Sequence, residues 1–148
     1  MKIVLLFVLC FGSGLTFYER LGTELLQADR FICLAFRHPG ETEVGAVLDR
    51  IEDFIMYLRR LRELRIDLQK KRAIRITDAL FDQGRPKFLQ IDYEELIPRL
   101  KSEFGWTDDD VEQLDELVAE TERVCGELYR KYKYSIYVKF STRKPLPF

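Results

Sequence analysis

The chain has 148 residues, of which 47% are hydrophobic and 13% aromatic, and its formal net charge is −1. This length allows one domain with a substantial core, and this composition excludes a low-complexity disordered protein. A net charge close to zero also gives no support to sequence-specific nucleic-acid binding, because that function needs a basic surface to neutralise phosphates.

The first residues have the pattern of a secretory signal peptide. Lys2 precedes an apolar run from Ile3 to Phe11, and the small residues Gly12-Ser13-Gly14 follow, where a peptidase can cut. The run is much shorter than the roughly 20 apolar residues that a membrane span needs. We therefore predict a signal peptide at residues 1–16 and a secreted, extracellular protein. The mature domain, residues 17–148, is predicted to have no membrane span.

Signal removal leaves two cysteines, Cys33 and Cys125, because Cys10 lies within the signal. In an oxidising compartment, two cysteines on predicted helices favour a single disulfide, which would join Cys33 to Cys125. The alternative is two separate buried thiols. A catalytic cysteine is not predicted, since the single histidine, His38, is the only base that it could pair with.

A first mature helix is predicted from Phe17 to Arg37. Thr16 and Glu19 have the spacing of a capping box, and His38-Pro39-Gly40 stops the helix and turns the chain. The apolar residues of this helix are spread widely enough for burial on more than one side: Phe17, Leu21, Leu25, Leu26, Phe31, Ile32, Leu34, Ala35 and Phe36.

The longest predicted element runs from Glu43 to Phe81 and is capped by Thr42. Its apolar residues recur at helical spacing on one face: Val47, Ile51, Phe54, Leu58, Leu61, Leu64 and Leu68. No proline interrupts the stretch, and an unbroken helix of this length would extend about 60 Å. We therefore predict one long central helix that either bends or stands out from the domain as an arm.

Charge is unevenly distributed along the chain. Residues 59–75 contain eight basic and two acidic side chains, whereas residues 92–122 contain two basic and twelve acidic ones. Such segregation can pack a basic helix beside an acidic one, as antiparallel neighbours, or attract a charged partner.

Arg65 and Arg72 follow Leu58 by seven and fourteen residues and so fall on the apolar stripe. Either the helix leaves the bundle there, or these two arginines form a cationic pocket for a partner or ligand, and we name both as candidate binding residues.

Two short stretches towards the C-terminus indicate strands. Pro86 opens the extended piece Lys87–Ile91, and apolar residues alternate with polar ones from Tyr134 to Phe140. Together these stretches predict a short two-stranded appendage, with residues 134–148 as a strand-like or extended tail.

Two further helices are predicted between these stretches. Asp92-Tyr93-Glu94-Glu95 has the pattern of an N-terminal cap, but Pro98 would clash deep inside a helix that starts there, so the first helix is predicted to begin near Pro98 and to reach Phe104, where Gly105 ends it. Thr107 begins an amphipathic helix that reaches about Tyr132. The three aspartates Asp108–Asp110 lack the spacing of a calcium loop, and capping together with the helix dipole explains them. We predict no metal site.

The sequence thus predicts a mainly α fold: an up-and-down bundle of four to five helices with one long central helix and a short two-stranded appendage near the C-terminus. Glycine-rich phosphate loops, serine elbows and histidine metal motifs are missing, so we predict neither enzymatic activity nor a cofactor. The expected function is binding of a partner protein through helix surfaces. The alternative is a carrier that holds a small apolar or fatty-acid-like ligand inside the bundle. A homodimer is compatible with either function.

Overall fold

The computed structural model describes the backbone of residues 2–63, 66–81 and 86–139, and the side chains of residues 20–63, 74–81 and 86–131. Within these ranges the chain forms five α-helices and one 3₁₀-helix, and it contains no strand. The prediction of a mainly α, helical bundle is therefore confirmed. Across the described residues, no helix combines the length and the apolar character that a membrane crossing needs.

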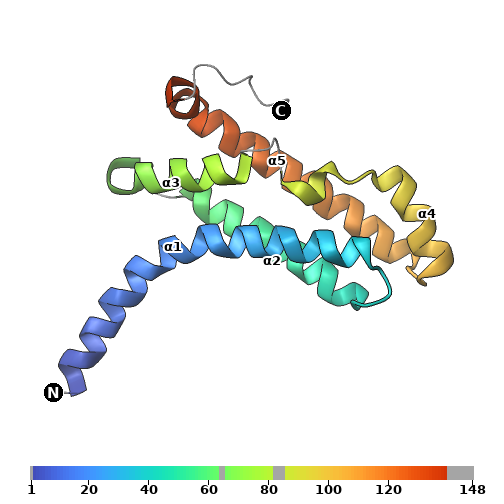
Figure 1. Cartoon of the computed structure of the whole chain (residues 1–148), viewed down its shortest axis with the longest axis horizontal. Coiled ribbons are helices and arrows are strands. Elements are labelled where there is room, and N and C mark those ends of the chain that lie inside the picture. Colours follow the sequence, from blue (N-terminus) through green and yellow to red (C-terminus); the bar gives the residue numbers. More distant parts are fainter. Residues whose placement is uncertain (1, 64–65, 82–85, 140–148) are drawn as a thin grey trace.

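The first helix, α1 (Lys2–Arg37), ends directly before His38-Pro39-Gly40, as predicted. Its predicted start at Phe17 is wrong, because the helix runs through Thr16 without a break and its backbone hydrogen bonds need no cap there. The N-terminal part of α1 extends away from the other helices (Figure 1). Its C-terminal part buries one stripe of residues: Leu21, Leu25, Ala28, Ile32, Ala35 and Phe36. Burial on more than one side was expected, but Leu26, Phe31 and Leu34 are exposed because α2, α3 and η1 cover only part of the helix surface.

The predicted long central helix is instead two helices, α2 (Val44–Glu63) and α3 (Ile66–Phe81). On α2 the predicted stripe is buried from Val47 to Leu61. A single straight helix would have left its second half without a packing surface. As a separate helix, α3 packs against both α1 and α5, where Leu80 and Phe81 become buried. Gly22 of α1 allows this close packing, since a Cβ there would lie 3.2 Å from Ile76 Cγ1.

The predicted strand at Lys87–Ile91 is a 3₁₀-helix, η1 (Lys87–Gln90). Its Phe88 and Leu89 side chains are buried, and the hydroxyl of Tyr93 donates a hydrogen bond to the Phe88 carbonyl. The N–H groups of Lys87 and Phe88 bond to the Asp29 carboxylate of α1 rather than to a neighbouring strand. Tertiary hydrogen bonds of this kind satisfy the backbone without a sheet.

The last helix begins at the predicted cap, whereas the helix before it begins at Tyr93, five residues ahead of the predicted start near Pro98. Asp92 accepts a hydrogen bond from the Glu95 N–H at the start of α4 (Tyr93–Glu103), and Thr107 and Asp110 form a reciprocal capping box at the start of α5 (Asp108–Lys139). Gly105, with φ of 70°, lets the N–H of Trp106 reach the Leu100 carbonyl. The predicted start at Thr107 is therefore confirmed. The predicted start near Pro98 is wrong, because the Asp92 cap begins the helix and Pro98 is accommodated within it.

The predicted C-terminal strand is also wrong over residues 134–139, which continue α5 as a helix. A strand there needed Lys87–Ile91 as its partner, but Lys87–Gln90 forms the 3₁₀-helix η1 and does not offer a strand edge. A lone strand would leave its backbone groups unpaired, whereas a helix satisfies them internally. Residues 140–148, the rest of the predicted tail, lie outside the described part of the chain.

The packing order of the helices differs from a simple up-and-down bundle. α2 lies between α1 and α5, and α3 contacts α1 and α5 (Figure 1). Arg59 pairs with Glu120 and Arg62 with Glu127, so the neighbours α2 and α5 run in the same direction rather than antiparallel. The reason is topological: α3, η1 and α4 return the chain to the end of the bundle where α2 begins.

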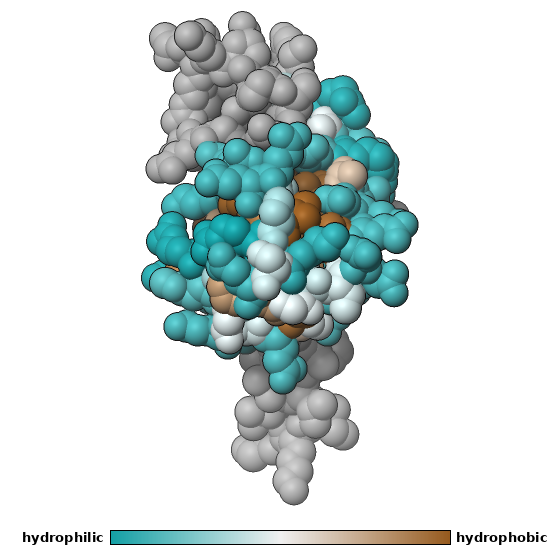
Figure 2. All heavy atoms as spheres, turned by 90° about the vertical axis from the view of Figure 1, so that its right-hand side faces the viewer, coloured by the Kyte–Doolittle hydropathy of each residue, from teal (hydrophilic) through white to brown (hydrophobic). Residues whose placement is uncertain are grey.

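One hydrophobic core joins these elements. Phe54 of α2 meets Phe88 of η1 edge to face at 5.0 Å between ring centroids, and Phe36 of α1 lies 5.7 Å from Tyr93 and 6.0 Å from Trp106. Viewed from the end of the bundle near α4, the surface is mostly hydrophilic, with a few hydrophobic side chains visible between the polar ones (Figure 2). Large apolar side chains are therefore mainly enclosed when seen from this end.

Candidate functional site

A surface hollow of about 520 Å³ lies where the outer face of α1 meets η1. Its walls are formed by residues of these two elements: Leu26, Asp29, Arg30, Cys33, Leu34 and Arg37 of α1, and Lys87 of η1. We call it the α1/η1 hollow. It brings cationic, apolar and thiol groups together around one open space.

Helical spacing explains why the α1 residues of the hollow share a face. Positions 26, 30, 33, 34 and 37 are separated by the three- and four-residue steps that align side chains along a helix. The buried stripe that includes Leu25 and Ile32 occupies a different face and sets the rotation of α1 in the bundle. This rotation leaves Leu26, Arg30 and Leu34 at the surface.

The inner wall of the hollow contains Asp29, a carboxylate that is only 6% exposed. Its two oxygens accept hydrogen bonds from the backbone N–H groups of Lys87 (3.0 Å) and Phe88 (2.9 Å). The Cys33 thiol makes a third, weaker contact at 3.8 Å. Asp29 thus caps the first turn of η1 from another helix and satisfies two N–H groups that η1 itself cannot bond.

Three cationic side chains line the same hollow as this carboxylate. Arg30, Arg37 and Lys87 are exposed, and none of their charged groups forms an ion pair with any of the residues whose side chains are described. Among the described residues that line the hollow, Asp29 is the one acidic group, and it balances only one of the three positive charges. The α1/η1 hollow therefore presents net positive charge to a binding group.

The two cysteines are free thiols, and the predicted disulfide between Cys33 and Cys125 is not present. Cys33 lines the hollow and points to Asp29, whereas Cys125 is fully buried in the core on α5. Burial, followed by the negative charge of Asp29, raises the pKa of Cys33 to about 11, and burial raises the pKa of Cys125 as well. Both thiols are consequently protonated at neutral pH, which makes them poor nucleophiles.

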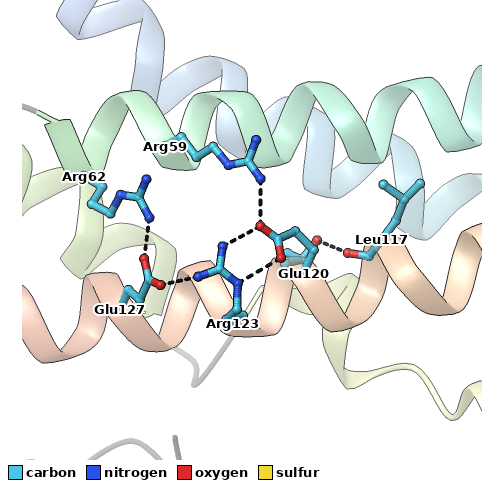
Figure 3. Close-up of polar contacts among 7 residues, drawn as sticks. Arg59, Arg62, Leu117, Glu120, Arg123 and Glu127 are labelled. Atoms are coloured by element: carbon cyan, nitrogen blue, oxygen red, sulfur yellow. Dashed lines mark hydrogen bonds and ion pairs between the residues drawn. The ribbon is translucent and has the colours of Figure 1, made fainter.

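A second polar feature joins α2 to α5 along the surface (Figure 3). Glu120 lies 2.7 Å from Arg59 across the helix pair and 2.6 Å from Arg123 on its own helix. Glu127 pairs in the same way with Arg62 and Arg123. The part of the basic segment that reaches α5 is thus neutralised within the fold, as one of the two sequence-based interpretations expected.

Acidification should weaken this α2–α5 network through Glu120. Hydrogen bonds from Arg123 and Arg59 lower the pKa of Glu120 to about 2 from its ordinary value of 4.5. A carboxylate with a lowered folded-state pKa stabilises the fold above its unfolded-state pKa, and that contribution is lost as the pH falls from 4.5 towards 2. We predict that Glu120→Gln lowers the free energy of unfolding at neutral pH by about 1 kcal/mol or less, because the network is largely exposed.

Urea titrations at neutral and acidic pH, at low and high salt, test this prediction. The difference in unfolding free energy between wild type and Glu120→Gln should shrink at acidic pH, because the Glu120 carboxylate becomes protonated. It should also shrink at high salt, because salt screens the ion pairs. Glu116→Gln, an exposed change on the same helix, provides the matched control. A difference that is independent of both pH and salt would contradict the assigned role of Glu120.

The side chains of the sequence-predicted binding residues, Arg65 and Arg72, are not among those that the structure describes. The structure therefore does not place the cationic pocket expected from them. Sequence reasoning missed Asp29, although a signal existed: this carboxylate follows Leu25 by four residues and so falls on the buried stripe of α1. A charged residue at such a position must have a buried partner.

The chemistry available at the hollow is recognition of an anion beside apolar surface. In the part of the chain whose side chains are described, no group of three or more His, Cys, Asp or Glu residues is placed to hold a metal ion. Comparison of the chain with protein-family models, with curated proteins and with solved structures finds no match. A functional assignment therefore depends on the physical character of the α1 surface.

Proposed function

We propose that this protein is a non-catalytic binding protein that contacts a partner protein through the outer face of α1. One observation carries the proposal: three large hydrophobic side chains are exposed on this helix, Leu26 by 48%, Phe31 by 38% and Leu34 by 45%. Leu26 and Leu34 share the walls of one hollow, and apolar surface grouped in this way and rimmed by charge is typical of protein interaction sites. We also propose export of the protein, on the basis of the signal-like residues 1–16.

The neighbourhood of these residues supports the same function. Leu26 and Leu34 lie two helical turns apart on walls of the α1/η1 hollow, which gives a partner side chain a concave place to enter. Phe31 is held beneath Arg50 of α2, whose guanidinium lies 5.8 Å from the ring centroid. An aromatic group held in this way loses little further conformational freedom when a partner covers it, which favours binding.

Site-specific photo-crosslinking tests the proposal. A benzophenone amino acid replaces Leu34 in the tagged full chain, expressed in the cells that produce the protein naturally. The matched control places the same amino acid at Met56 of α2, which is equally exposed (40%) but does not line the hollow. We expect a discrete protein adduct from position 34 and none from position 56.

A second substitution distinguishes specific contact from chance collision. Leu26→Glu, introduced beside the probe at position 34, should reduce the adduct about tenfold or more, because it places a charge on the apolar face of the interface. Equal adducts from positions 34 and 56, or no adduct at all, would contradict the proposal. Native mass spectrometry of the same preparations tests the carrier alternative, since a ligand held inside the bundle adds mass that denaturation removes.

A further inference from the structure

We infer that the partner presents an acidic amphipathic helix, whose carboxylate enters the α1/η1 hollow among Arg30, Arg37 and Lys87. This inference rests on the proposed function and specifies the chemistry of the partner. Its basis is a combination of unpaired positive charge and flanking apolar surface in one concave place.

The charge balance of the hollow selects an anion. The cationic groups of Arg30, Arg37 and Lys87 form no ion pair with the residues whose side chains are described. Asp29 balances only one of these three positive charges, so the described groups that line the hollow keep a net positive charge. Arginine binds a carboxylate through two parallel hydrogen bonds, so an acidic side chain fits this arrangement well.

The apolar groups select a helix over a simple anion. Leu26 and Leu34 are eight residues apart on α1, which separates them by about 12 Å along the helix, with Arg30 halfway between them. A second helix repeats its own face every seven or eight residues. Two apolar residues at that spacing, with a carboxylate between them, would therefore meet Leu26, Leu34 and Arg30 in register.

The same charges argue against a second copy of this chain at this face. A twofold symmetric contact that packs α1 against α1 would place Arg30 near its own symmetry mate, together with the other cations of the hollow. Like charges brought together at an interface oppose association. An acidic partner avoids this repulsion, because its carboxylates attract the cations of the hollow.

Designed peptides provide the probe. The acidic peptide is an 18-residue helix with leucines seven residues apart and glutamates between them, and its matched control carries glutamine in place of each glutamate. Binding to the full chain is measured by fluorescence anisotropy. We expect the acidic peptide to bind about 30-fold more tightly than the glutamine peptide, and this preference to decrease with salt.

Charge-reversal variants locate the contact. Arg30→Glu/Arg37→Glu should weaken binding of the acidic peptide about 30-fold or more and should improve binding of a lysine version of the peptide. Arg99→Glu, on the exposed surface of α4 away from the hollow, is the matched control and should change affinity less than twofold. Circular dichroism verifies that all variants are folded.

Alkylation of Cys33 gives an independent readout at the site. Cys33 lines the hollow while Cys125 is fully buried, so a maleimide reagent reports on Cys33 in a chain that carries Cys10→Ser. The reaction is run at alkaline pH, because the raised pKa of Cys33 keeps its thiol protonated near neutrality. The acidic peptide should slow this reaction, and vesicles of phosphatidylserine should not. Protection by vesicles but not by peptide would overturn the inference in favour of a membrane surface, as would equal binding of the acidic and glutamine peptides.

The native crosslinking experiment separates this inference from the proposed function. If Leu26→Glu abolishes the native adduct but Arg30→Glu/Arg37→Glu does not, partner binding through α1 stands and the acidic character of the partner is refuted. If neither set of changes affects the adduct, the proposed function itself fails, whatever the peptides do.

Discussion

Replacement of Phe88 by alanine is expected to lower the free energy of unfolding by about 3–5 kcal/mol. Phe88 is fully buried although it belongs to a four-residue 3₁₀-helix, and its ring packs edge to face on Phe54 of α2. Its removal would lose the transfer free energy of the ring and leave a cavity between η1 and α2. Chemical denaturation monitored by circular dichroism measures the loss.

Two comparisons make the Phe88 prediction specific. Phe31→Ala removes the same ring from an exposed position on α1 and should cost less than about 1 kcal/mol. A double-mutant cycle of Phe54→Ala and Phe88→Ala should give a coupling of about 0.5–1.5 kcal/mol from the ring contact. Loss of stability no greater for Phe88→Ala than for Phe31→Ala would show that η1 does not belong to the core.

Asp29→Ala is expected to lower the free energy of unfolding by about 3 kcal/mol. The substitution leaves two backbone N–H groups at the start of η1, those of Lys87 and Phe88, without their acceptor, and each unsatisfied buried N–H costs roughly 1–3 kcal/mol. Asn at this position keeps one acceptor oxygen and should lose about half as much. Urea titration measures the loss, and hydrogen exchange of the two amides locates it.

A matched control and a second readout accompany the Asp29 variants. Asp49→Ala, an exposed change on α2, should alter stability by less than about 0.5 kcal/mol. Asp29→Asn should also lower the pKa of Cys33 from about 11, because the negative charge of Asp29 raises it, while burial should keep it above the ordinary value of 9.0. An unchanged rate of amide exchange at Lys87 and Phe88 would contradict the capping role of Asp29.

These two residues illustrate how the fold holds the α1/η1 hollow in place. Asp29 and Phe88 join η1 to α1 and α2 by two different interactions, one polar and one apolar. The joint places Lys87 against the outer face of α1 and completes the hollow. We therefore expect mutations in this joint to affect binding indirectly, through the geometry of the hollow, as well as stability.

Much of the helical structure was predictable, because helix formation depends on residues close together in the chain. The stripe from Val47 to Leu61, the stop at His38 and the cap at Thr107 all follow from helical periodicity or from hydrogen bonds within one turn. The pairing of basic with acidic helix faces was also indicated by composition. Its direction was not, because charge complementarity is the same for parallel and antiparallel helices.

The candidate site was much less predictable. Exposed Leu26 and Leu34 looked like core residues, since apolar character alone does not say which face of a helix its neighbours will cover. Arg30 and Arg37 looked like ordinary surface charges until η1 placed Lys87 beside them. Short-range patterns carry no information about which distant segment will pack against a helix, and the hollow consists of such a contact.

The sequence by itself determined the mainly α character of this protein, the starts of α2 and α5, the ends of α1, α3 and α4, and the buried face of α2. Local hydrogen bonds and periodic burial, on which these features depend, are properties of neighbouring residues. Only the tertiary structure decided that residues 43–81 form two packed helices, that Lys87–Gln90 is a 3₁₀-helix capped by Asp29, and that α2 and α5 lie parallel. These features depend on burial between distant segments and on backbone groups that bond to partners far away in the sequence. The free energy of the whole chain, and not the preference of any local stretch, therefore decides them.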